Sequence, residues 1–248
     1  MSDDAIPAAT IILVRERSGS APELLMVERA QEMAFAGGAW VFPGGRIDKA
    51  DEQFGGRFDT QDAAARVAAI REALEETAIP VGLSPVPLGQ DSRDLQAALL
   101  AGVEFGRLLA ERRLDLDLAA LVPLARWVPR FHAKRRFDTL FFVARAPSGN
   151  WEPNAVESEC AGAHWISASE VLERDRAGEL QLIFPTRRTL ERLARHGSFD
   201  AILADARSQP VEPITPWVEE VDGERFITIP EGIGYPVTKE RLEGLWRG

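Results

Sequence analysis

The sequence predicts an α/β (α+β) sandwich of strands and helices. Strand-like and helix-like segments alternate along the chain, which is typical of such sandwiches. An alanine-rich helical segment follows a Pro-Gly-Gly turn, and the last forty residues carry the pattern of a β-hairpin. With 45% apolar and 27% charged residues in a chain of 248, the composition is that of a globular protein with a buried core.

The N-terminal part predicts three strands. Residues 8–14 are apolar and partly β-branched, and residues 24–27 form a second apolar run. The turn-rich link Ser18–Pro22 between them predicts a hairpin. A third strand at 40–42 ends at Pro43-Gly44-Gly45, where the glycines indicate unusual backbone angles or a close approach to another group.

The helices follow from propensity and periodicity. Residues 61–77 are rich in alanine and place Val67, Ile70 and Leu74 on one face, with Asp59 or Thr60 as the cap. The remaining predicted elements are a helix over 94–111, strands at 127–128, 139–144 and 163–166, a helix capped by Ser167 or Ser169, and a helix over 186–195.

The predicted organisation is one domain over residues 1–205, with a helical insert at about 84–122, and a tail over 206–248. The tail begins with a connector that contains Pro210, Pro213 and Pro216. Asp222-Gly223 is the two-residue signal of a hairpin between strands 217–221 and 224–229. In that register Glu220 faces Arg225 and Val218 faces Ile227.

Composition excludes several classes of function. The formal charge of 29 − 39 = −10 argues against a nucleic-acid-binding face, which needs clustered Lys and Arg. The single Cys160 and three scattered histidines exclude a disulfide framework and a cysteine zinc cluster. No run of about 18–20 apolar residues and no signal peptide is present, so we expect a cytoplasmic protein without a membrane partner.

The main chemical signal is a set of three carboxylates on the alanine-rich helix. Glu72, Glu75 and Glu76 stand three and four residues apart, so they project to one side. Like charges at this spacing repel by a few tenths of a kcal/mol per pair. Such a run can be a solvated helix face, but the upstream Gly44-Gly45 turn favours a site for Mg²⁺ or Mn²⁺, which prefer oxygen ligands.

These residues resemble the sequence box of the Nudix hydrolases, G-x5-E-x7-R-E-U-x-E-E-x-G-U, in which U is a bulky apolar residue. Phe42-Pro43-Gly44-Gly45 is similar to the entry of the box. The matching positions are Gly45, Arg71, Glu72, Glu75, Glu76 and Ile79.

The chain departs from the box at four points. Asp51 stands where the family has a glutamate, Ala73 is small for the U position, and Ala78 replaces the glycine. Between Asp51 and Arg71 there are 71 − 51 − 1 = 19 residues where the box has seven. This makes an insert of twelve residues. We expect the chain around 52–59 to loop out before the helix, which puts the participation of Asp51 in doubt.

The resemblance implies a Nudix-type α/β/α sandwich with a mixed sheet, and hydrolysis of a pyrophosphate bond by a metal-activated water. It assigns Glu72 and Glu76 as the leading metal ligands, with Glu75 as a ligand or as the holder of a metal-bound water. The carbonyl of Gly44 is a further ligand, and Arg71 orients a carboxylate through a charge-assisted hydrogen bond.

In many members of the family a later loop supplies a general base. Glu159 is the favoured candidate here, ahead of Glu157. Two exposed loop acids would produce the same pattern.

The extended box Trp40–Asp48 and the stretch 135–142 resemble a coenzyme A diphosphatase subgroup of the family. The implied substrate is coenzyme A or an acyl-CoA. Arg29, Arg135 and Arg136 are then candidates to bind its phosphates, and Phe137 is a candidate to stack on the adenine.

Other functions stay open at this point. A pyrophosphatase of this type can act instead on ADP-ribose or dinucleotides, and a domain with an altered box can sense nucleotides without turnover. A structural protein-interaction domain is a third option, supported by the tail alone. The expected partner is a small nucleotide substrate, and a homodimer is a further expectation because family members often dimerise.

Overall fold

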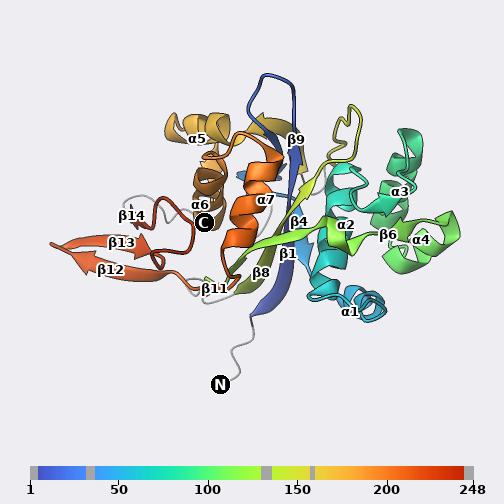
Figure 1. The fold of residues 1–248 in the computed structure, drawn as a ribbon, viewed down its shortest axis with the longest axis horizontal. Helices are drawn as coiled ribbons and strands as arrows, with labels where there is room; N and C mark the ends of the chain where they lie inside the picture. Colours follow the sequence, from blue (N-terminus) through green and yellow to red (C-terminus); the bar gives the residue numbers. More distant parts are fainter. Residues whose placement is uncertain (1–4, 32–36, 130–135, 157–159, 243–248) are drawn as a thin grey trace.

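The computed structural model describes residues 5–31, 37–129, 136–156 and 160–242. Its centre is a mixed sheet with helices on both faces (Figure 1). The strands of this sheet are β1 (Ile6–Arg15), β2 (Glu23–Arg29), β3 (Ala39–Val41), β4 (Gly44–Arg46), β7 (Val122–Trp127), β8 (Phe137–Arg145), β9 (Cys160–Ser167), β10 (Gln181–Leu182) and β11 (Pro213–Ile214). The predicted α/β sandwich with a mixed sheet is therefore confirmed.

Strand β1 is the branch point of the sheet. It runs parallel to β8 along almost its whole length, from Ile6 opposite Phe137 to Val14 opposite Arg145. On its other side it pairs antiparallel with β4 near its start and with β2 at its end. The predicted hairpin between β1 and β2 is confirmed, and β9 and β3 extend the sheet beyond β2.

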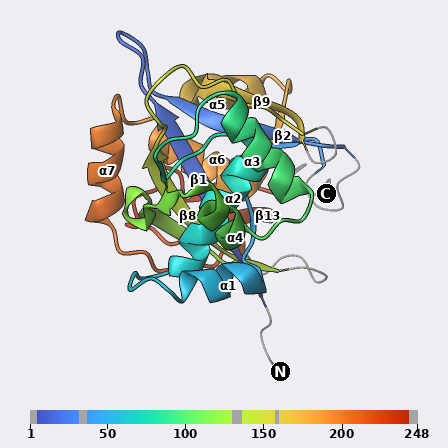
Figure 2. The same ribbon diagram turned by 90° about the vertical axis from the view of Figure 1, so that its right-hand side faces the viewer.

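One helical layer contains α1 (Lys49–Gly55), α2 (Ala63–Thr77), α3 (Gln90–Leu100) and α4 (Phe105–Arg112), all on the same side of the sheet (Figure 2). Helix α2 packs its predicted apolar face, Val67, Ile70 and Leu74, into the core on this side. The short elements β5 (Leu83–Ser84), β6 (Asp115–Leu116) and the 3-10 turn η1 (Leu118–Ala120) flank α3 and α4.

Three sequence-based expectations for this layer are wrong. The predicted helix 94–111 is two helices, because the chain turns between them at Gly102 with φ +84°. Residues 52–59 do not simply loop out, since α1 forms there behind a capping box made by Asp48 and Asp51. The N-cap of α2 is Asp62 rather than Asp59 or Thr60, and its side chain makes no capping hydrogen bond.

The opposite face of the sheet carries α5 (Ala168–Arg176), α6 (Phe184–Leu193) and α7 (Phe199–Ser208). Ser167 caps α5 by accepting a hydrogen bond from the N–H of Glu170. Of the two predicted caps, Ser167 and Ser169, the structure confirms Ser167. Helix α7 was not predicted. No helix in the described ranges combines the length and the apolar character needed to cross a bilayer.

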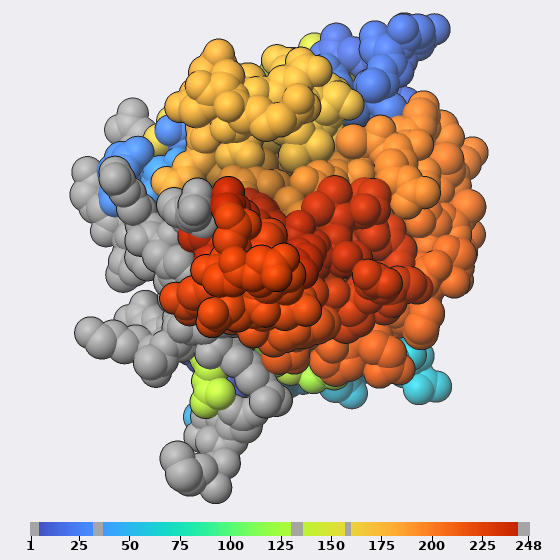
Figure 3. All heavy atoms as spheres, turned by 90° about the vertical axis from the view of Figure 1, so that its left-hand side faces the viewer, coloured from blue at the N-terminus to red at the C-terminus, as the bar shows by residue number. Residues whose placement is uncertain are grey.

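The C-terminal strands are β12 (Trp217–Val221), β13 (Glu224–Thr228) and β14 (Lys239–Arg241). The predicted hairpin is confirmed in its register, since Val218 pairs with Ile227 and Glu220 with Arg225. Strand β14 adds a third strand to it. Figure 3 shows these residues, coloured red, spread over the face that lies opposite α1 to α4.

The tail shares its core with the rest of the chain. Ile227, Ile229 and Tyr235 are buried in the same apolar cluster as the sheet residue Trp127. The indole N–H of Trp127 donates to the hydroxyl of Tyr235 at 3.2 Å. The division at residue 205 stays a prediction.

Candidate active site

The acidic side of α2 lies directly against β4. The backbone N–H of Gly44 donates to Oε2 of Glu76 at 3.1 Å. A Cβ placed on Gly45 would lie 2.3 Å from Oε1 of Glu72, so a side chain at position 45 cannot coexist with this position of Glu72. The glycine turn predicted to approach another group therefore approaches the carboxylates of α2.

Arg71 links four acceptor groups at the start of this acidic stretch. Its guanidinium donates to both carboxylate oxygens of Asp51, at 3.0 and 2.8 Å. It also donates to Oε1 of Glu72 at 2.9 Å, to Oε2 of Glu75 at 2.8 Å and to the carbonyl of Arg46 at 3.0 Å. The structure thus brings Asp51, which is 1% exposed, next to the residues of the box.

The electrostatics of the cluster are dominated by an excess of negative charge. Burial raises the pKa of Glu72 to about 7; Arg71 opposes this rise and Glu75 adds to it. Burial alone would lower the pKa of Arg71, but Asp51, Glu72 and Glu75 raise it above its usual value. One guanidinium therefore faces several carboxylates, and an added cation would relieve their repulsion.

The donor chemistry fits a hard divalent cation, because carboxylates and a backbone carbonyl are the ligands that Mg²⁺ prefers. In the described ranges no three His, Cys, Asp or Glu side chains converge on a common point as an ion would require. Glu72 and Glu75 turn toward Arg71, and Glu76 turns toward the N–H of Gly44. Ion binding would need these carboxylates to move closer to one another.

The end of α2 is shaped by Ala78, which stands where the box has a glycine. It adopts the left-handed conformation with φ 57°, and its N–H donates to the carbonyl of Leu74. The helix therefore ends at the position of the box glycine although alanine is strained there.

The proposed substrate-binding residues that the structure describes lie at the ends of two strands that flank β1. Arg29 ends β2, and its Nε is buried without a hydrogen-bond partner in the described ranges. Arg136 and Phe137 stand at the start of β8, which β1 separates from β4. Arg135, Glu157 and Glu159 fall outside the described residues.

Three residues near the acidic cluster were doubted or missed in the sequence-based site. Asp51 was doubted because of the insert, although the acidic residues at positions 48 and 51 carried a capping signal. Gln96 and Asn154 were missed, because a polar residue in a helix and one in a loop carry no pattern of their own. Both contact the end of α2.

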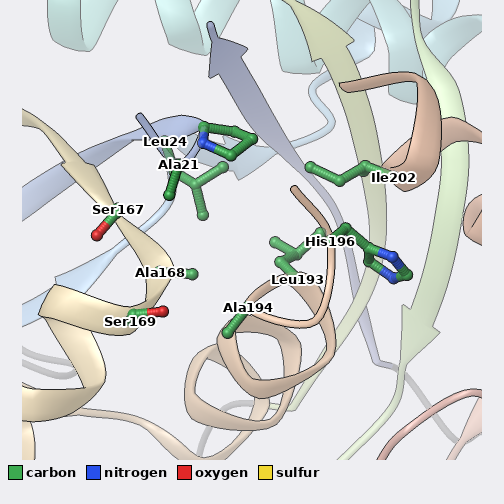
Figure 4. A pocket seen from close by; sticks show the side chains of 10 residues that line it. Ala21, Leu24, Ser167, Ala168, Ser169, Leu193, Ala194, His196 and Ile202 are labelled. Atoms are coloured by element: carbon green, nitrogen blue, oxygen red, sulfur yellow. The ribbon is translucent and has the colours of Figure 1, made fainter. Parts of the chain in front are cut away.

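A small cavity lies away from this cluster. It is bordered by Ala21 and Pro22 of the β1–β2 turn, Ser167 at the start of α5, and Leu193 and His196 at the end of α6 (Figure 4). Its volume of about 20 Å³ accommodates about one water molecule. It contains none of the candidate catalytic residues.

Comparison with protein families gives a match to the NUDIX domain over residues 5–96. The chain is 26% identical over 231 residues to a putative nudix hydrolase 7 of Caenorhabditis elegans. This alignment covers 89% of this chain and 70% of that protein. It is 27% identical over 252 residues to the acyl-coenzyme A diphosphatase NUDT19 of Homo sapiens, covering 79% of this chain and 66% of that protein.

Among solved structures, the chain is similar to a NUDIX hydrolase from Alicyclobacillus acidocaldarius. The two share 29% sequence identity and superpose with a TM-score of 0.72. The likeness covers 82% of this chain and 97% of the other.

Proposed function

Because the chain belongs to the Nudix hydrolase family, we propose that it hydrolyses the pyrophosphate bond of coenzyme A or an acyl-CoA. The family and the enzyme class, a Nudix pyrophosphohydrolase, agree with the prediction from the sequence. Enzymes of this family generally use divalent metal ions and act on small nucleotide derivatives. The choice of coenzyme A and of Mg²⁺ or Mn²⁺ is the part that we propose.

One observation carries the proposal: the carboxylates of α2 are held against the Gly44–Gly45 turn and around Arg71. Glu72, Glu75, Glu76 and the carbonyl of Gly44 would hold the ion. A bound Mg²⁺ or Mn²⁺ offsets charge on the phosphate oxygens and makes water a better nucleophile.

The chain's own residues orient the acidic cluster. Arg71 fixes Glu72 and Glu75 by charge-assisted hydrogen bonds, and Asp51 holds the far side of its guanidinium. The N–H of Gly44 holds Glu76. Glu159 remains the proposed general base on the strength of the resemblance.

The choice of substrate has two supports. The human relative is named as an acyl-coenzyme A diphosphatase, and the alignment covers most of this chain. Coenzyme A carries a pyrophosphate and an additional 3′-phosphate, for which Arg29, Arg135 and Arg136 are proposed ligands. The unpartnered Nε of Arg29 is a hydrogen-bond donor that a phosphate oxygen would satisfy. Phe137 is the proposed stacking partner of the adenine.

The decisive experiment is a panel of coenzyme A, an acyl-CoA, ADP-ribose and a dinucleotide, each with Mg²⁺ or Mn²⁺, with products identified by mass. Release of 3′,5′-ADP from coenzyme A or the acyl-CoA is the expected result. If ADP-ribose is hydrolysed with release of AMP and coenzyme A and the acyl-CoA are not, ADP-ribose replaces coenzyme A as the substrate. Binding without turnover of any compound would instead indicate a nucleotide-sensing domain. The proposed homodimer is tested separately by analytical ultracentrifugation.

A further inference from the structure

The carbonyl groups at the end of α2 are satisfied by two segments that lie outside the box. The last turn of a helix leaves carbonyls without partners inside the helix. Here the carbonyl of Glu75 accepts from the side-chain amide of Gln96 at 2.9 Å, and that of Thr77 accepts from the backbone N–H of Asn154 at 2.8 Å. The carbonyl of Ala78 accepts from the hydroxyl of Ser92. Gln96 and Ser92 belong to α3, within the helical insert.

Gln96 and Asn154 also bind each other. The amide nitrogen of Gln96 donates to the backbone carbonyl of Asn154 at 2.8 Å, and the side-chain amide of Asn154 donates to Oε1 of Gln96 at 2.7 Å. Gln96 is 2% exposed, so water does not compete for these hydrogen bonds. The two amides therefore form a bracket, the Gln96–Asn154 pair, that ties α3 and the loop 146–156 to the backbone of Glu75.

The loop that carries Asn154 is anchored at a second point. The indole N–H of Trp165 donates to the carbonyl of Trp151 at 2.8 Å, and Trp151 is itself packed into the core on the α2 side. The loop is thus fixed to β9 at Trp151 and to α2 at Asn154. In the sequence, Asn154 stands five residues before Glu159.

We propose that Gln96 and Asn154 are positioning residues for the hydrolytic reaction: the bracket sets the place of Glu75 and Glu76 relative to the 146–156 loop. The inference rests on the proposed function. Because a small displacement of a reacting group can cost about 100-fold in rate, loss of the bracket should lower kcat more than it alters KM. Neither residue contacts the substrate in this scheme.

The structure offers a matched control for this test. Ser92 lies on the same helix as Gln96, is equally buried, and also donates to a carbonyl at the end of α2. Unlike Gln96, it forms no hydrogen bond with Glu75 or Asn154 among the described residues. Ser92→Ala therefore reports the effect of weakening the helix end, whereas Gln96→Met removes the bracket at nearly constant volume.

The test compares wild type, Gln96→Met, Asn154→Ala, the double variant and Ser92→Ala, with kcat, KM and Mn²⁺ affinity measured well below each Tm. We expect Gln96→Met to lower kcat about 10- to 100-fold and to weaken Mn²⁺ binding, with KM nearly unchanged. Asn154→Ala keeps the two backbone hydrogen bonds of Asn154, so it should have a smaller effect in the same direction. The double variant should be no worse than Gln96→Met, because that substitution already removes the hydrogen bond between the two side chains that Asn154→Ala removes. Ser92→Ala should lower Tm while keeping kcat within about twofold of wild type.

Two results would overturn the inference. One is a kcat and a Mn²⁺ affinity near wild type in folded Gln96→Met; the other is an equal loss of kcat in Ser92→Ala, which would mean that general destabilisation is the cause. Failure of the proposed function is separate, since it appears as a wild-type protein that turns over no member of the substrate panel. In that event the Mn²⁺ affinities still test the inference: weaker binding by Gln96→Met than by wild type supports it, and equal binding contradicts it.

Discussion

The guanidinium of Arg71 donates two parallel hydrogen bonds to the carboxylate of Asp51, which lies twenty residues earlier in the chain. Both side chains are nearly buried, at 11% and 2% exposed. The same carboxylate accepts from the N–H of Asp48 and so completes the capping box of α1. The pair therefore fastens the inserted helix α1 to the helix that carries the acidic cluster.

Asp51→Ala should destabilise the protein by about 3 kcal/mol, because it leaves a buried guanidinium without its bidentate partner and removes one half of the capping box. Hydrolysis should also fall, since Arg71 loses the group that orients it. Urea unfolding measures the first effect. Glu52→Ala, at the exposed neighbouring position on α1, is the control and should change stability by less than about 0.5 kcal/mol.

Gly45→Ala should abolish most of the hydrolytic activity while the protein remains folded. The new Cβ would lie 2.3 Å from Oε1 of Glu72, so the carboxylate must leave its position. Circular dichroism and turnover of the best substrate check the two parts of this prediction. Gly56→Ala is the control because its Cβ would meet only the carbonyls of Glu52 and Gln53, at 3.4 and 3.6 Å. Full activity of Gly45→Ala would show that the position of Glu72 is not needed.

Glu76→Gln should lower kcat at least about 100-fold and weaken Mn²⁺ binding, since a neutral amide is a poorer ligand for a hard cation. Stability without metal should be unchanged or slightly raised. A glutamine can still accept from the N–H of Gly44, and one repelling charge is removed. Thermal unfolding in EDTA measures this stability. Severe unfolding of the metal-free variant would contradict the assignment of Glu76 to the metal site.

The pH dependence of stability should change in Glu191→Gln. Burial raises the pKa of Glu191 to about 7 in the folded protein; Arg188 opposes this rise and Glu240 adds to it. Because the folded pKa lies above the unfolded value near 4.5, the folded state binds the extra proton. The stability that this proton contributes is complete below about pH 4.5 and is lost as the pH rises to about 7.

The Glu191→Gln variant lacks this titration, and its amide oxygen can still accept from Arg188. Relative to the variant, wild type should therefore lose up to about 3 kcal/mol between pH 4.5 and 8. Urea unfolding at several pH values gives the difference. Glu173→Gln, at an exposed position on α5, is the control. Parallel profiles for wild type and Glu191→Gln would refute the prediction.

Local signals accounted for the elements that the sequence predicted well. The alanines and the apolar spacing of α2 predict a helix wherever it packs, and Asp222-Gly223 sets the register of β12 and β13 by turn geometry alone. The box residues likewise stand on one helix, so their common direction follows from helical periodicity.

The features that were missed depend on contacts between distant segments. Whether the chain around 52–59 loops out or continues α1 is decided by packing on α2 and by the Arg71–Asp51 pair, which joins positions on either side of the insert. The Gln96–Asn154 pair joins residues 58 positions apart. A sequence pattern with a short period cannot contain either relationship.

Strand β1 holds the glycine turn and the start of β8 on its two sides. Ala8 lies opposite Arg46 of β4 on one side and opposite Thr139 of β8 on the other. Strand β1 therefore positions both the Gly44–Gly45 turn, which we propose to hold the metal, and the segment that begins with Arg136 and Phe137, which we propose to bind the substrate. A shift of this strand by a single residue would move the proposed metal site relative to the proposed substrate-binding residues, so the register of β1 sets the distance at which the two can act on one ligand.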